Sequence, residues 1–168
     1  MFNCAMHVKN TLTEYGLISK LLHWVSAVLL LIQIPLGFYL VDLDFGPERL
    51  NIENIHVAVG LAIFYLVIFR LINNILNPTP KLEPNIFKGQ KLLAKLNHVL
   101  LYVTILSITI SGILKKLFNG EVLIIIFKKI KIQDNFELGE LFYDIQVYSN
   151  YLLIALIIIH LMAVIIHK

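Results

Sequence analysis

The sequence is poor in cysteine and in charge. Its single cysteine, Cys4, excludes a disulfide framework, a paired-cysteine metal motif and a motif for covalent haem attachment. Charged residues make up 15% of the 168 residues, against 58% hydrophobic residues. A soluble domain of this size does not need so much apolar content, because its surface must be polar. We therefore expect an integral membrane protein.

Four apolar runs are each long enough to cross a hydrocarbon core of about 30 Å, which takes about 20 helical residues. The predicted helices cover about 17–41, 52–75, 92–114 and 145–166. Together they predict an all-α fold, a four-helix transmembrane bundle occupying residues 17–168 as one domain.

The segments outside these helices are expected to be loops and a tail. Residues 1–16 form an N-terminal tail that we place in the cytoplasm, with His7 solvated and disordered. Gly46 and Pro47 are expected to lie in the loop after the first helix. The connection over 115–144 contains a short apolar block, VLIIIF, expected at the membrane interface or over the end of the bundle.

The distribution of basic residues predicts the orientation. The loop after the first helix carries Arg49 against four acidic residues, whereas the connection after the second carries four lysines against Glu83. Since basic loops stay in the cytoplasm, we expect a bacterial inner-membrane protein with both termini cytoplasmic. The five lysines within 115–144 argue the other way, but that connection is long and holds matching acidic residues. We attribute the net charge of +3 to this topology and expect no nucleic-acid partner.

Each apolar run carries one histidine near a predicted membrane boundary. These are His23, His56, His98 and His160. A histidine in hydrocarbon is costly unless something uses it, so four of them suggest axial ligation of haem between helices. The alternative is an interfacial side chain bonded to water or a lipid headgroup. This alternative suits His167, which adjoins the terminal lysine. His167 also shares a helix face with His160, so it stays a second candidate ligand.

The order and spacing of these motifs resemble the bacterial cytochrome b561 family, which is related to the haem b subunits of membrane formate dehydrogenases and nickel hydrogenases. The resemblance covers nearly all of the chain from Tyr15. The matching segments are Ser19–Trp24, Ile55–His56 with Gly60, Arg70, Asn77–Pro80, Asn97–His98 with Tyr102 and Gly112, and His160 with His167. The resemblance implies a four-helix bundle that holds two b-type haems, one near each membrane face.

The resemblance also implies the ligands of both haems. His23 and His160 would ligate the inner haem, and His56 would share the outer haem with a residue fourteen positions before His160. Fourteen residues span about 21 Å and keep both positions on one helix face. That position is Gln146, and an amide is a poorer axial ligand than imidazole. The outer haem is then five-coordinate through His56, bound by another residue such as Tyr143 or Tyr148, or absent.

Three further side chains are assigned to the surroundings of the inner haem: His98, Arg70 and Lys95. His98 is expected to bond a haem propionate or to line a quinone site. Arg70 and Lys95 are expected to pair with propionates, because buried carboxylates need cationic partners. The alternative for both cations is snorkelling, or a role in the orientation of the chain.

The expected function is one-electron transfer, because bis-imidazole haem has no open coordination position. The resemblance implies a membrane-bound b-type cytochrome that carries electrons between a donor, superoxide in some family members, and membrane quinone. It could thus be an oxidoreductase of the superoxide:quinone type or a plain electron carrier.

Two alternatives stay open. The first is a haem b anchor subunit of a dehydrogenase, bound to a redox partner protein. The second is a non-haem membrane protein with incidental histidines. The common depth of His23 and His160 counts against this second alternative. So does the lack of any acidic residue in the middle of the four runs, where a transporter would be expected to have one.

Overall fold

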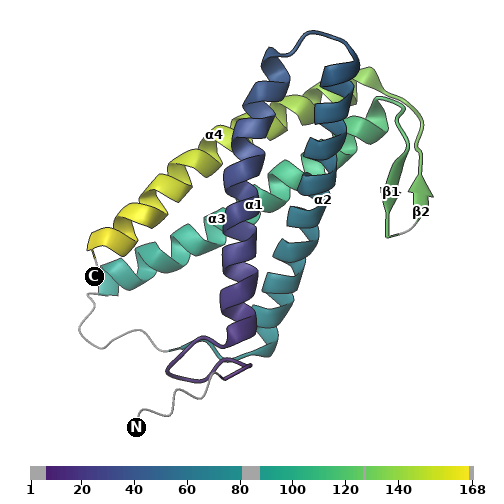
Figure 1. Cartoon of the computed structure of the whole chain (residues 1–168). Helices are drawn as coiled ribbons and strands as arrows, with labels where there is room; N and C mark the ends of the chain where they lie inside the picture. The colour runs from purple at the N-terminus through teal and green to yellow at the C-terminus, as the bar shows by residue number, and fades with distance from the viewer. Residues whose placement is uncertain (1–6, 81–87, 127, 167–168) are drawn as a thin grey trace. The chain divides into compact units, whose positions relative to one another are not determined.

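The computed structural model describes residues 7–80, 88–126 and 128–166. The described residues form four long helices and one small β-hairpin (Figure 1). The elements are α1 (Leu17–Asp42), α2 (Pro47–Leu76), α3 (Lys88–Phe118), β1 (Leu123–Ile125), β2 (Lys128–Ile130) and α4 (Phe136–Ile166). All four helices are long and apolar enough to cross a membrane, which confirms the predicted four-helix transmembrane class.

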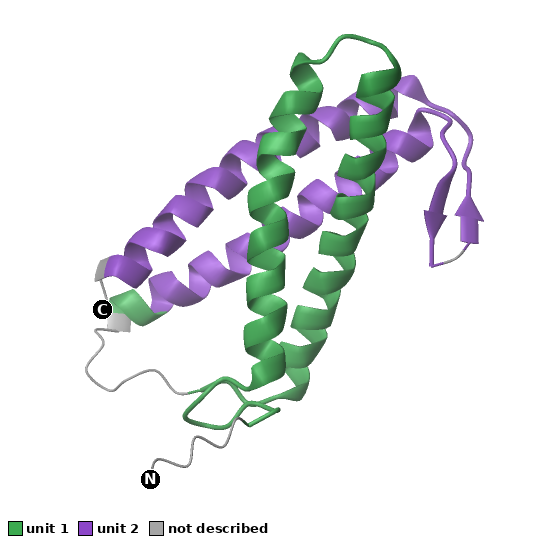
Figure 2. Ribbon diagram, viewed as in Figure 1, with its two compact units in different colours: residues 1–91 green, residues 92–168 purple. Residues whose placement is uncertain are grey.

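The chain divides into two compact units, residues 1–91 and 92–168 (Figure 2). In unit 1, α1 and α2 lie side by side and run antiparallel (Figure 1). In unit 2, α3 and α4 do the same, with the β-hairpin in their connection. Polar and aromatic contacts join α3 to α4. The Ser107 and Ser149 hydroxyls lie 3.1 Å apart, and the rings of Phe118 and Phe142 stack at 5.6 Å.

The second helix begins earlier than the sequence predicts. It starts at Pro47, with Gly46 as its N-cap, rather than at about residue 52. Proline has no N–H to leave unpaired and its fixed φ suits the first helical turn, so Pro47 opens the helix instead of forming the loop. Glu48 in the same turn interacts favourably with the helix dipole. The placement of Pro47 in the loop was therefore wrong.

The fourth helix also begins earlier, at Phe136 rather than at about residue 145. The Asn135 side-chain oxygen accepts the backbone N–H of Leu138 at 3.1 Å, and its carbonyl accepts that of Gly139 at 2.9 Å. Asn135 is thus the N-cap, and Glu137 follows in the first turn. This extension carries α4 through a polar stretch that hydropathy alone assigned to a connection.

The third helix continues to Phe118, past the predicted end near 114. Lys115 and Lys116 lie in its last turn, where cations interact favourably with the helix dipole. Gly120, at φ +79°, adopts the left-handed conformation that commonly ends a helix. Residues 115–118 and 136–144 of the predicted 115–144 connection are therefore helical. Its apolar block contributes to the antiparallel pairing of β1 with β2, and its expected place at the interface stays a prediction.

The described part of the N-terminal tail is tied to the end of unit 1. The backbone N–H of Leu17 donates to the His7 carbonyl at 2.9 Å. The Asn10 side-chain oxygen accepts from Gly16 N–H and from the Ser19 hydroxyl, at 2.9 and 2.6 Å. His7 is exposed, as expected, but the expected disorder of its backbone was wrong. The Asn10 amide also donates to the Pro78 carbonyl at 3.2 Å, so the tail links the start of α1 to the chain just past the end of α2.

Candidate functional site

One spacing recurs on all four helices. Each carries two conspicuous residues fourteen positions apart: His23 and Gly37 on α1, His56 and Arg70 on α2, His98 and Gly112 on α3, and Gln146 and His160 on α4. Fourteen residues are about four turns, so the two members on each helix share a face about 21 Å apart. Within each unit the structure brings these residues into two contacting pairs.

His23 and Arg70 form the terminal pair of unit 1, named for the helix ends at Leu17 and Leu76. Each lies about 9 Å from that end of its own helix. The Arg70 Nη2 atom lies 3.1 Å from His23 Nδ1, and both side chains are half-buried. Arginine only donates, so Nδ1 is the acceptor and the neutral ring carries its proton on Nε2.

His98 and His160 form the terminal pair of unit 2. Their ring centroids lie 5.2 Å apart with the planes at 69°, an edge-to-face contact. His160 lies about 9 Å from the end of α4 at Ile166. Beside it, the Asn97 Nδ2 atom lies 3.4 Å from His160 Nδ1. Asn97 is buried, and its Oδ1 atom has no hydrogen-bond partner among the described residues.

Gly37 and His56 form the hairpin pair of unit 1, and Gly112 and Gln146 form that of unit 2. A Cβ atom on Gly37 would lie 3.2 Å from His56 Cε1. One on Gly112 would lie 2.9 Å from Gln146 Nε2. In each unit, therefore, a glycine lets the neighbouring polar side chain lie close against the backbone of the adjacent helix.

A half-buried glutamine, Gln33, lies beside the hairpin pair of unit 1. The Gln33 amide donates to the backbone carbonyl of His56 at 2.9 Å. Its Oε1 atom is buried and accepts no hydrogen bond from the described part of the chain. Gln33 was missed in the sequence, and Asn97 was noted without a role. The signal that finds both is a polar side chain inside an apolar run, which is costly unless something uses it.

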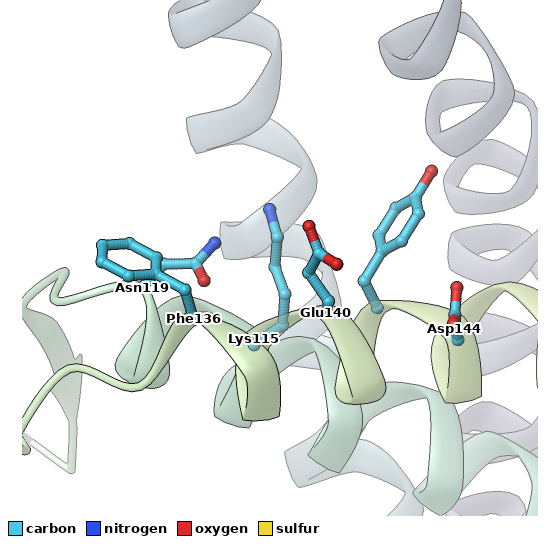
Figure 3. Close-up of a pocket in the computed structure, with 7 residues that line it drawn as sticks. Lys115, Asn119, Phe136, Glu140 and Asp144 are labelled. Carbon is cyan, nitrogen blue, oxygen red and sulfur yellow. The ribbon is translucent and has the colours of Figure 1, made fainter.

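A cavity of about 440 Å³ opens at the end of unit 2 where α3 ends and α4 begins (Figure 3). Lys115, Glu140 and Asp144 point toward it, so two carboxylates face one ammonium group. The remaining lining residues are Asn119, Phe136, Gly139 and Tyr143. Tyr143 lies three residues before Gln146 and shares its face, whereas Tyr148, 73% exposed, does not.

The other sequence-predicted residues are placed as follows. Lys95 is exposed, and His167 lies outside the described residues. Within the ranges that the structure describes, no three His, Cys, Asp or Glu side chains are grouped to hold a metal ion. Haem does not need such a group, because the porphyrin supplies four ligands and the protein one or two.

Four membrane-spanning helices that present histidines at fixed depths have the architecture of a membrane-bound haem protein. The chain belongs to the prokaryotic cytochrome b561 family, whose model matches residues 14–168. It is similar to "Cytochrome b561 homolog 2" of Escherichia coli (strain K12), with 27% identity over 117 residues. That match covers 69% of this chain and 62% of the relative's length. The family identifies a multi-pass bacterial membrane protein of the b-type cytochrome class.

Proposed function

We propose that this chain is an electron carrier of the bacterial inner membrane that binds one haem b through His23 and His160 and exchanges electrons with membrane quinone. The family supports the class of b-type cytochromes. The observation that supports the ligand assignment is the equal distance of the two histidines from the ends of their own helices. Each lies about 9 Å inside the terminal end of its own helix, beside a polar side chain.

The terminal pairs fit haem b in their chemistry. His23 and His160 would hold haem b there, and the bound haem would supply one-electron chemistry. Arg70 can donate to a propionate in a charge-assisted bond, which is stronger than its 3.1 Å contact with a neutral imidazole. Once Arg70 releases Nδ1, His23 can carry its proton there and present Nε2 as a ligand. His98 is exposed beside His160, as a propionate partner or a quinone-site residue would be.

The hairpin pairs offer one imidazole only, that of His56. Gln146 stands at the position where the family resemblance places its partner, and an amide oxygen is a weak ligand for haem iron. We therefore propose a single bis-histidine haem per chain. Any haem at the hairpin pairs would be held by His56 alone and would be high-spin.

The cavity at the end of unit 2 bears on the electron donor. Glu140 and Asp144 outnumber Lys115 in its lining, so Coulomb repulsion disfavours an anion there. We propose a neutral or cationic donor at that cavity, or a redox partner protein, rather than superoxide. The surrounding lipid and the quinone are the other expected partners.

The test is the haem content of protein purified in detergent after expression with adequate haem. We expect one low-spin b haem per polypeptide by pyridine haemochrome and electron paramagnetic resonance, and its reduction by a quinol. Two low-spin haems would contradict the single bis-histidine site. A colourless protein would contradict the haem assignment altogether. Slow reduction of the haem-loaded protein by a quinol would contradict the proposal that quinone is its electron-transfer partner.

A further inference from the structure

We propose that Asn97 is the positioning residue of His160. Its side-chain oxygen accepts the Nδ1–H of the imidazole and so keeps Nε2 unprotonated for the iron. This inference rests on the proposed function, in which His160 is an axial ligand. It adds a residue that contacts the ligand and not the metal.

The first observation is an unsatisfied buried acceptor next to the ring. Asn97 is 9% exposed, and its Oδ1 atom has no hydrogen-bond partner among the described residues. The amide nitrogen faces His160 Nδ1 at 3.4 Å, which is long for a hydrogen bond. A half-turn of the amide exchanges its oxygen and nitrogen without moving the rest of the side chain. That half-turn brings the unsatisfied oxygen to Nδ1.

The second observation is what the ring needs in order to bind iron. A ligating histidine donates its other ring N–H to a carbonyl or carboxylate oxygen, which fixes the tautomer and the ring orientation. With Asn97 Oδ1 as acceptor, the proton of His160 lies on Nδ1 and the Nε2 lone pair is available. The same half-turn therefore satisfies the buried oxygen and prepares the ligand.

The two proposed ligands differ in this respect. The neighbour of His23 Nδ1 is Arg70, which only donates and must leave before Nδ1 can carry a proton. The neighbour of His160 is an amide, which changes from donor to acceptor in place. His160 is thus the ligand that the polypeptide orients in advance.

The experiment compares Asn97→Leu with Asn97→Asp in the full-length, haem-loaded protein. Leucine has a similar size and no acceptor, whereas aspartate keeps an oxygen at the same position. For Asn97→Leu we expect haem affinity to fall by about 10–100-fold, as for other residues that orient a metal ligand. We also expect its midpoint potential to shift to more positive values, because the imidazole donates less electron density. Asn97→Asp should stay low-spin, with a potential shifted to more negative values.

Ser107→Ala is the matched control, because it removes a hydrogen bond between α3 and α4 that lies about 15 Å along α3 from Asn97. It should leave both haem affinity and potential unchanged. Equal potentials in wild type, Asn97→Leu and Asn97→Asp would overturn the inference while the bis-histidine haem stands. If Asn97→Leu does not fold, an unshifted potential in Asn97→Asp alone overturns it. A wild-type protein without low-spin haem overturns the proposed function and this inference together.

Discussion

The terminal and hairpin pairs are built on the same fourteen-residue spacing and differ in their chemistry. The terminal pairs hold three histidines and Arg70, with Asn97 beside them. The hairpin pairs hold His56, Gln146 and two glycines. The spacing is thus kept on α4 even where one of its two positions carries no histidine. The helices set the depth of each candidate ligand, and the side chain at that depth decides what can bind.

The glycines sharpen this difference. Gly37 and Gly112 let His56 and Gln146 approach the adjacent helix so closely that a Cβ atom would lie 3.2 and 2.9 Å from them. The backbone of the hairpin pairs is therefore as open on the Gln146 side as on the His56 side. The Gln146 side lacks an imidazole. Three substitutions test this difference between the terminal pairs and the hairpin pairs.

The largest effect is expected from His160→Ala, because it removes one of two axial ligands. We expect loss of the low-spin haem from purified protein, measured by pyridine haemochrome and by the reduced-minus-oxidised spectrum. His98→Ala is the matched control, since its ring touches that of His160 at 5.2 Å but is not a proposed ligand. Low-spin haem retained in His160→Ala and lost in His98→Ala would exchange the roles of the two histidines.

The next effect is expected from Gln146→His, which gives the hairpin pairs a second imidazole. Low-spin haem should rise from one to two per chain, because imidazole is a much better iron ligand than an amide and Gly112 leaves room for the ring. Gln146→Leu should stay at one. An unchanged haem content and spin state in Gln146→His would mean that the two pair types differ in more than this ligand.

The four-helix class could be predicted because hydropathy acts over whole helices and tolerates errors at their ends. The ends themselves were missed where local chemistry overrides hydropathy. Pro47 starts α2 because proline suits a first helical turn, and Asn135 caps a polar first stretch of α4. A composition-based reading assigns both residues to loops.

The distances of His23 and His160 from the ends of their own helices could be predicted because spacing along a helix fixes them. That of His56 could not, because α2 begins at Pro47 rather than at about residue 52. The polar neighbours of His23 and His160 could not be predicted either, because those contacts join residues far apart in the sequence. Arg70 meets His23 across 47 positions, and Asn97 meets His160 across 63. The expectation that Arg70 pairs with a propionate stays a prediction, since the structure shows it on the histidine.

The smallest effect is expected from Arg70→Gln, which removes the one cation of the terminal pairs. A nearby positive charge stabilises the reduced haem, so its loss should shift the midpoint potential to more negative values. At an effective dielectric constant of about 20, the shift should correspond to about 1–2 kcal/mol. Arg70→Lys should shift it less, because lysine keeps the charge and loses the bidentate geometry. Lys20→Gln is the control, since Lys20 is an exposed cation three residues from His23 and solvent screens it. An equal shift in Lys20→Gln and Arg70→Gln would mean that Arg70 acts as a general surface charge, and the terminal pairs would then owe their chemistry to the histidines alone.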